Sequence, residues 1–322
     1  MRVAVLSGGR SSEHEVSLRS GAAVAEGLGE AGHEVVAVRI ERDGRWAVDG
    51  EPIDVSFGAG LLGVDVAFPV LHGPYGEDGT VQGALECLDV AYVGPGVLAA
   101  AVCIDKLTFK RLLAFHAIPQ VDFLAVGEDG WRERALALDP PLWVKPSRLG
   151  SSVGISKVGD PSSELDAAVE AARRHDPRVI VEANSSGREV ECSVIGNDAP
   201  ETSLPGEIVA HADWYDYEAK YEPGGMDLVV PAPLDEATTR RVRELAASVY
   251  RAAACSGLAR CDFFVDESGE VLVNELNTIP GFTETSVFAK LFEATGVPYS
   301  ELCDRLVRFA VERYDAERGY EF

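Results

Sequence analysis

Oxygen-bearing side chains are concentrated in two predicted strands near the carboxyl end of the chain. The first strand contains Arg260 and Asp262, a turn follows at residues 267–269, and the second strand contains Glu275 and Asn277. Because side chains alternate between the two faces of a strand, pairing of these strands brings Asp262 near Glu275 and Asn277. Two carboxylates and an amide, beside an arginine, suit a hard cation that also binds phosphate oxygens. An acidic surface hairpin is the alternative interpretation, since the whole chain is acidic.

A glycine- and serine-rich loop is the second candidate site. The segment WVKPSRLGSSVGISKV (143–158) predicts strand, loop and strand, with Lys145 before the loop and Ser151 and Ser152 at its tip. Glycine lets backbone N–H groups approach phosphate oxygens closely, and a lysine adds positive charge. No helix is predicted directly after the loop, which distinguishes it from the GxxxxGK[ST] phosphate loop. A flexible hairpin is the alternative.

Two glutamates flank a turn-rich loop further along the chain. Glu182 and Glu189 are seven residues apart, so one carboxylate could accept from an adenine amino group and the other from ribose hydroxyls. Two surface glutamates would give the same pattern. Lys106 opens a predicted helix and could equally be an ordinary solvent-exposed lysine.

Several loops contain groups that could bind a small charged substrate. Glu13 lies at a predicted helix start, where it could meet an ammonium group or cap the helix. Residues 72–83 are rich in turn formers, and residues 213–221 form a long aromatic loop of the kind that often covers an active site. The backbone N–H of Gly281 could face an oxyanion, and Ser286 opens a helix whose N-terminus favours a carboxylate.

Composition restricts the class of protein. The 322 residues, 46% of them hydrophobic, predict two or three domains with substantial cores. The longest apolar run, residues 96–104, is too short to span a bilayer, and no leading segment has the length of a signal peptide. We therefore expect a soluble, cytoplasmic protein. A net charge of −24 argues against binding to nucleic acid or an anionic membrane. The six cysteines lack CxxC spacing and predict free, mostly buried thiols.

The order of predicted elements divides the chain into three units. The first alternates strands and a helix, which indicates a parallel α/β unit whose functional loops follow the carboxyl ends of strands. The second mixes helices with strands around the glycine- and serine-rich loop, and the third contains a long helix and the acidic hairpin. The predicted units span residues 1–95, 96–181 and 182–322.

In this order the segments resemble the ATP-grasp ligases and, within them, the D-alanine–D-alanine ligases. The resemblance covers almost the whole chain and rests on LSGGRSSEHEVSLRSG, HGPYGEDGTVQG, VGPGVLAAAVCIDK, WVKPSRLGSSVGISKV, WYDYEAKY, RCDFF and NELNTIPGFTETS. It implies an α/β ATP-grasp architecture: a Rossmann-like N-terminal substrate domain, then a central lid domain and a C-terminal catalytic domain that clasp the nucleotide. It also implies a homodimer that joins two D-alanine molecules through an acyl phosphate for peptidoglycan synthesis, with ATP as co-substrate and two Mg²⁺ or Mn²⁺ ions.

The resemblance assigns the nucleotide end of the site residue by residue. Phosphate-binding residues would be Lys106 and Lys145, with Ser151 and Ser152 closing over them. Base and ribose contacts would be Glu182 and Glu189, and metal ligands would be Asp262, Glu275 and Asn277. Polar Asn184 and Ser185 stand where the family usually has apolar residues near adenine, so the shelf under the base is expected to be weaker.

The substrate end is assigned in the same way. Arg260 and the Gly281 amide would stabilise the oxyanion. Glu13, linked to Ser151 and Tyr221, would face the ammonium of the first D-alanine. The remaining substrate-binding residues implied are His72, Ser286, Val287 and Lys220. Both His72 and the network around Glu13 are candidates for the general base.

Three other activities remain open from the residues alone. Two are ligases that join D-alanine to D-lactate or to D-serine, and the third is a non-catalytic nucleotide-binding regulator. The intact set of Arg260, Asp262, Glu275 and Asn277 argues against a regulator, which needs no oxyanion site. Tyr221 matches the tyrosine of dipeptide-forming members, which favours D-alanine as the second substrate.

Overall fold

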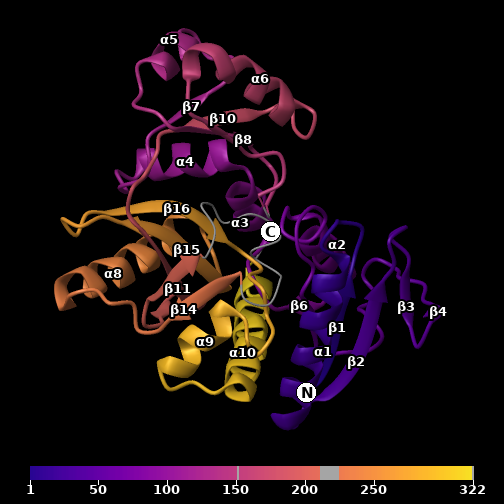
Figure 1. Ribbon diagram of the computed structural model, residues 1–322. Coiled ribbons are helices and arrows are strands. Elements are labelled where there is room, and N and C mark those ends of the chain that lie inside the picture. Colours follow the sequence, from indigo (N-terminus) through magenta and orange to yellow (C-terminus); the bar gives the residue numbers. More distant parts are fainter. Residues whose placement is uncertain (151, 211–224, 321–322) are drawn as a thin grey trace.

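The computed structural model describes residues 1–150, 152–210 and 225–320. Its strands form three separate sheets, each with helices packed against it, so the protein is of the mixed α/β class. The three sheets lie in three lobes. The lobe of the central part of the sequence is at the top of Figure 1, and the N-terminal and C-terminal lobes lie below it.

The N-terminal sheet has a parallel core. Strand β1 pairs in parallel with β2 and β5, and β5 pairs in parallel with β6. A short antiparallel hairpin at one edge, β3 and β4, was not predicted, and neither was α2. The elements are β1 (Arg2–Gly8), α1 (His14–Glu30), β2 (Glu34–Ile40), β3 (Trp46–Val48), β4 (Glu51–Pro52), β5 (Val66–Pro69), α2 (Thr80–Leu88) and β6 (Ala91–Tyr92).

The central sheet is antiparallel, in the order β7-β10-β8-β9. Leu142 and Val144 of β8 are buried in a core with α5 and α6, so Trp143 and Lys145 between them face the opposite side. The elements are β7 (Phe123–Ala125), α5 (Trp131–Leu136), β8 (Leu142–Pro146), β9 (Ser156–Val158), α6 (Pro161–Arg173) and β10 (Val179–Glu182).

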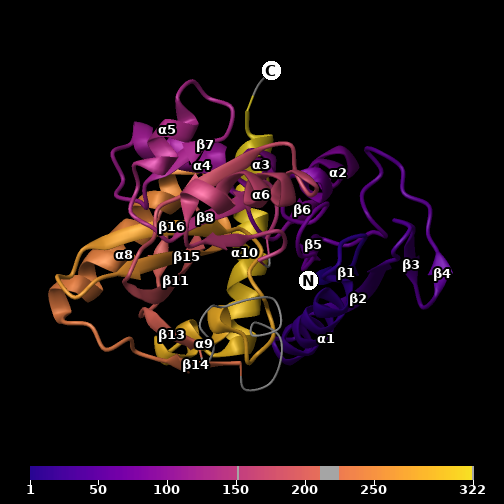
Figure 2. The same cartoon turned by 45° about the horizontal axis from the view of Figure 1, so that its top comes forward.

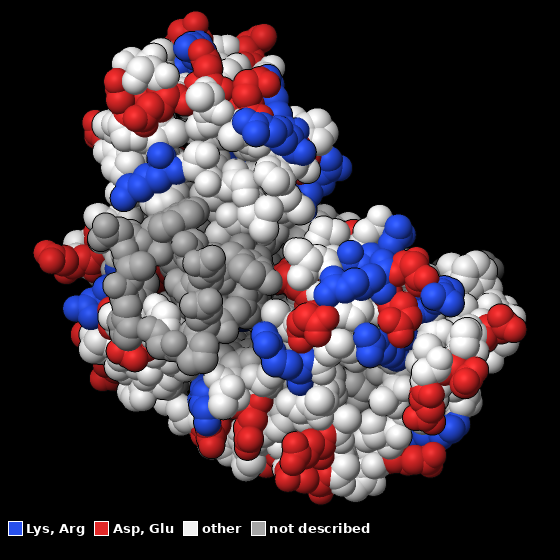
Figure 3. Space-filling model, turned by 45° about the vertical axis from the view of Figure 1, so that its right-hand side comes forward, with Lys and Arg blue, Asp and Glu red and all other residues white. Residues whose placement is uncertain are grey.

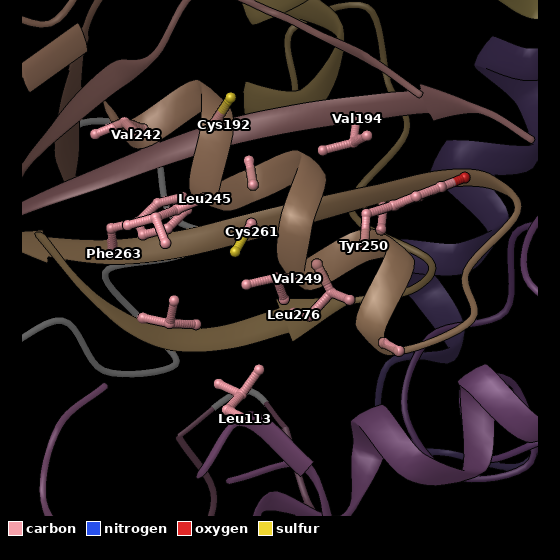
Figure 4. Close-up of a cluster of buried hydrophobic side chains, with 14 of the residues drawn as sticks. Leu113, Cys192, Val194, Val242, Leu245, Val249, Tyr250, Cys261, Phe263 and Leu276 are labelled. Atoms are coloured by element: carbon pink, nitrogen blue, oxygen red, sulfur yellow. The ribbon is translucent and has the colours of Figure 1, made fainter. Parts of the chain in front are cut away.

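The C-terminal sheet has the order β14-β13-β11-β15-β16, with β12 paired to β11. One face is covered by α8, whose apolar side packs onto alternate residues of β11 and β15 (Figure 4). The opposite face is partly covered by α9 and α10 and elsewhere carries polar side chains. The elements are β11 (Arg188–Gly196), β12 (Glu201–Thr202), β13 (Gly206–Ala210), β14 (Met226–Val229), α8 (Glu236–Ala252), β15 (Gly257–Val265), β16 (Val271–Asn277), α9 (Val287–Ala294) and α10 (Tyr299–Arg318).

Three helices join the lobes. Ala99 and Cys103 of α3 (Val97–Ile104) and Phe109 of α4 (Lys106–Phe115) share the core of the C-terminal sheet, although they precede the central sheet in sequence. Helix α10 packs against α1 and β6 of the N-terminal lobe as well as β15, and it lies between the two lower lobes in both Figure 1 and Figure 2. The lobes are therefore connected by packed helices and not by linkers alone.

The cysteines, the surface charges and the helix lengths can be compared with what the composition predicted. All six cysteines are free, and five of them are buried. Acidic and basic side chains are interspersed over the N-terminal and central lobes (Figure 3). Within the described part of the chain, no helix is both long and apolar enough to cross a membrane.

Candidate active site

A row of carboxylates crosses the polar face of the C-terminal sheet. The register places Glu191 of β11 opposite Asp262 of β15, and Asp262 opposite Glu275 of β16. Asn277 lies two positions after Glu275, opposite Arg260, and donates from Nδ2 to Asp262 Oδ2 at 2.8 Å. Asp262, Glu275 and Asn277 are thus brought together, as the alternation of the hairpin predicted.

Arg260 neutralises part of this row. Its Nε lies 2.7 Å from Asp262 Oδ1 and 2.8 Å from Glu191 Oε2, and its second nitrogen donates to Asp262 Oδ2 at 2.8 Å. Burial opposes the charge of the guanidinium, but Asp262 and Glu191 outweigh burial and hold the pKa of Arg260 well above its usual value. The arginine is therefore a fixed cation beside the carboxylates.

Lys106 connects the carboxylate row to the glycine- and serine-rich loop. It is the first residue of α4, which is capped by Asp105 through a bond from Thr108 N. The ammonium donates to the carbonyl of Leu149 at 2.9 Å and lies 3.3 Å from Glu275 Oε2. One lysine thus contacts both the loop and a predicted metal ligand.

A buried ion triad lies on the other side of this loop. Glu182 Oε2 is 2.6 Å from Lys145 Nζ, and Glu182 Oε1 is 3.1 Å from Lys110 Nζ. Burial alone would raise the pKa of Glu182, but the two ammonium groups overcome it and hold that pKa at about 2. Burial lowers the pKa of Lys110, whereas the pKa of Lys145 is raised, because Glu182, Glu275 and Glu189 together outweigh the effect of burial there. Both carboxylate oxygens of Glu182, the predicted adenine contact, therefore bind lysines.

These groups line one pocket between the central and C-terminal sheets. It includes the predicted nucleotide residues Lys106, Lys145, Ser152, Glu182 and Glu189, together with Glu275. Trp143, Asn184 and Ser185 line the same pocket, and the Trp143 indole N–H donates to Asn184 Oδ1 at 3.1 Å.

A second pocket lies between the N-terminal and C-terminal lobes. It is lined by the predicted metal ligand Asn277 and by most of the predicted catalytic and substrate-binding residues, namely Glu13, His72, Arg260, Gly281, Ser286 and Val287. Glu13 is buried, and a Cβ on Gly73 would lie 2.6 Å from its Oε2. With a φ of 73° as well, position 73 requires glycine.

The structure bears on one alternative for Glu13 and one for His72. Glu13 precedes α1 but makes no side-chain cap, so the capping alternative is wrong. His72 is buried, with Nδ1 3.1 Å from the carbonyl of Ile279 and Nε2 3.1 Å from Ser20 Oγ. Burial lowers the pKa of His72 against the opposing charge of Glu13. Both ring nitrogens are therefore engaged, which disfavours His72 as general base.

The loop after β16 and the start of α9 line the same pocket. Ser286 is the N-cap residue of α9, and its Oγ accepts from Thr283 N at 2.9 Å. A Cβ on Gly281 would lie 3.3 Å from this Oγ, so the glycine allows the turn to pack closely. The start of α9 and the Gly281 amide thus line one wall.

The two pockets share Gly150 and Glu275, so they meet at the carboxylate row. One side of this junction has lysines suited to phosphates, and the other has a buried carboxylate and a helix N-terminus suited to an amino acid. This arrangement has room for a phosphate-bearing ligand on one side of Glu275 and a small zwitterion on the other.

Three of the predicted site residues are not among those that the structure describes. Ser151, Lys220 and Tyr221 lie outside the described residues. Sequence reasoning missed Glu191, Lys110 and Glu77. Glu191 could have been found, because it is two residues from Glu189 and therefore on the same face of one strand.

Glu77 is one of four glutamates that line the second pocket, with Glu13, Glu191 and Glu275. Its Oε2 accepts from Gly73 N at 2.7 Å. Burial raises its pKa to about 8, helped by the nearby charge of Glu13 and opposed by N–H groups of Gly73 and Ile279.

Two family models match the chain. "D-ala D-ala ligase N-terminus" matches residues 2–57 and 53–95, and "D-ala D-ala ligase C-terminus" matches residues 112–308. Among curated relatives, a D-alanine–D-alanine ligase of Solibacter usitatus is 45% identical over 100% of this chain and 99% of its own. One from Deinococcus radiodurans is 46% identical over 97% and 98%.

Solved structures agree with these matches. The D-alanine–D-alanine ligase from Coxiella burnetii superposes with a TM-score of 0.90 at 36% identity, over 99% of this chain and 96% of that one. The VanG D-Ala:D-Ser ligase from Enterococcus faecalis gives 0.87 at 36% identity, over 96% and 99%. The expected ATP-grasp fold is thereby confirmed.

Proposed function

Since this chain belongs to the D-alanine–D-alanine ligase family, we propose that it uses ATP to join two D-alanine molecules into D-alanyl-D-alanine for peptidoglycan precursors. The observation that carries the proposal is the junction at Glu275 of a lysine-lined pocket with a second pocket lined by Glu13 and the start of α9. The expected cytoplasmic location and homodimer form part of the proposal.

The first step activates a carboxylate, which is a poor acyl donor. A carboxylate oxygen of the first D-alanine attacks the γ-phosphorus of ATP, and the bond to the bridging oxygen breaks to give D-alanyl phosphate and ADP. Lys106 and Lys145 line the phosphate end of the pocket and would hold the nucleotide in line for this attack. Glu13, buried at the opposite end, would hold the ammonium of the same D-alanine.

The second step forms the peptide bond. The unprotonated amine of the second D-alanine attacks the acyl carbon, and loss of phosphate from the tetrahedral intermediate gives the dipeptide. Arg260 and the Gly281 N–H would stabilise the oxyanion, and removal of one such donor typically costs about 100- to 1000-fold in rate. Ser286 and Val287 at the start of α9 would receive the second carboxylate.

Mg²⁺ or Mn²⁺ fits the carboxylate row by donor chemistry. Asp262, Glu275 and Asn277 offer only oxygen ligands on facing positions of two paired strands, and hard divalent cations prefer oxygen. Lys106 and Arg260 already contact these carboxylates as cations, so the row is suited to positive charge. Two ions held there would neutralise charge on the phosphate oxygens.

Phosphate release in the presence of ATP and each amino acid tests the proposal. We expect release with D-alanine and none with L-alanine. Equal turnover of both enantiomers, or none with D-alanine, would contradict it. Product analysis with D-serine and D-lactate separates dipeptide formation from the alternative ligases, of which the D-serine type is represented among the similar structures.

A further inference from the structure

The backbone of Ile279 is held from the N-terminal lobe. His72 Nδ1 lies 3.1 Å from the Ile279 carbonyl, and because a carbonyl only accepts, Nδ1 carries the proton. Ser20 Oγ lies 3.1 Å from Nε2, which in the neutral ring is the acceptor. Ser20 therefore fixes the tautomer that His72 needs to bind Ile279.

Glu77 holds the other hydrogen-bonding group of the same residue. The Ile279 N–H is a hydrogen-bond donor toward the Glu77 carboxyl group and opposes the rise in its pKa caused by burial, and Gly73 N donates to Glu77 Oε2 at 2.7 Å. His72 and Glu77 lie on one loop, which follows β5 of the N-terminal sheet. This loop thus satisfies both the N–H and the C=O of Ile279, which belongs to the catalytic lobe.

The residues after Ile279 are fixed by packing to the same lobe. Phe282 is buried, and its ring lies 5.6 Å from that of Phe68 in β5. Its carbonyl accepts from Tyr299 Oη at 2.9 Å. Gly281 therefore lies between two anchored residues, and the direction of its N–H depends on both anchors.

We propose that His72 and Glu77 are positioning residues that clamp Ile279 and thereby aim the Gly281 N–H at the oxyanion. This inference rests on the proposed function. In this role His72 aligns the second step and does not transfer a proton. Residues of both the N-terminal and the C-terminal lobe then shape the oxyanion site. A misplacement of about 1 Å in such a site can cost about 100-fold in rate.

The two chemical steps separate this role from a general structural one. Scrambling of ¹⁸O from the β–γ bridge of ATP, with D-alanine present, reports reversible carboxylate phosphorylation without the tetrahedral intermediate. Dipeptide formation needs both steps. For Glu77→Met, which has similar size but no acceptor, we expect the ratio of scrambling to dipeptide formation to rise by about 100-fold.

Conservative variants provide the rescue. Glu77→Gln retains a carbonyl oxygen for the N–H groups, and His72→Asn places an amide N–H near the position of Nδ1, whereas His72→Leu has no donor. We expect the Gln and Asn variants to retain most dipeptide formation and His72→Leu to behave like Glu77→Met. Asp78→Asn is the matched control, because Asp78 accepts from Tyr75 N and Thr80 N, both close to it in the chain.

Each outcome decides the proposal. If scrambling and dipeptide formation fall together in both His72→Leu and Glu77→Met, the loop has a general structural role and the clamp is wrong. If neither activity changes, the clamp is also wrong. Should Glu77→Met fail to fold, the comparison of His72→Leu with His72→Asn decides alone. Wild-type protein that makes no dipeptide would instead refute the proposed function.

Discussion

Replacing Glu182 by glutamine should destabilise the protein strongly, because it leaves Lys110 and Lys145 without the carboxylate between them. Lys110 is 1% exposed and Glu182 is 4% exposed at the side chain. Breaking a buried ion pair by removing one partner costs about 3–5 kcal/mol, since the remaining charge stays buried and uncompensated. Glu182→Gln keeps the shape of the side chain, so the loss reports charge and not a cavity.

The ability of Lys110 to release its proton sets an upper limit on this loss. Deprotonating a lysine with an ordinary pKa of about 10.4 at pH 7 costs about 4.6 kcal/mol of free energy, at about 1.36 kcal/mol for each pH unit. The folded variant binds fewer protons than the unfolded chain in this range, so its stability rises with pH. The loss of unfolding free energy in Glu182→Gln should therefore be about 2.7 kcal/mol smaller at pH 9 than at pH 7.

Urea unfolding of wild type and variants at the two pH values measures this effect. Lys110→Met, which leaves a neutral pair of Glu182 and Lys145, should be less destabilising than Glu182→Gln, and the double variant should recover part of the loss. Glu170→Gln is the control, because Glu170 pairs with Arg173 at the surface, where such pairs contribute about 0–1 kcal/mol. A Glu182→Gln variant of wild-type stability with weakened ADP binding would refute this reasoning and make Glu182 a base contact.

Three further results are expected. In wild type the stability supplied by Glu182 is present above its ordinary pKa and is lost as pH falls toward about 2; an acid titration in which Glu182→Gln shows the same loss would contradict this. Glu275→Gln should abolish turnover with little change in melting temperature, and EDTA should stop wild-type turnover until Mg²⁺ is restored; near-normal activity in either case would make the acidic hairpin structural. Tyr221→Phe should shift the kcat/KM ratio toward D-lactate by about 2- to 13-fold, the equivalent of one hydroxyl contact; product analysis with both acceptors measures it, and an unchanged ratio would exclude Tyr221 from acceptor choice.

Local patterns predicted much of the fold and the metal end of the site. Alternation along residues 257–265 and 271–277 placed Asp262, Glu275 and Asn277 together, and the register confirms their convergence. Strand, helix and strand with glycine between them predicted the parallel N-terminal sheet. In both cases the decisive information lies within a few residues of sequence.

The unpredicted features depend on contacts between distant segments. Lys110 looks like a surface lysine of an amphipathic helix, and it is buried only because β10 brings Glu182 against α4. Glu77 lies in a turn-rich loop, and its partner Ile279 is in another lobe. No spacing within either segment encodes these pairings.

Transfer of ¹⁸O from D-alanine to phosphate tests the central claim most directly. With both carboxylate oxygens of D-alanine labelled, the acyl-phosphate route leaves one labelled oxygen in the phosphate for every dipeptide formed, alongside ADP. Mass spectrometry of the phosphate and the dipeptide measures both products. We expect equal amounts of labelled phosphate and D-alanyl-D-alanine, whereas dipeptide formed with unlabelled phosphate, or with AMP in place of ADP, would contradict the mechanism.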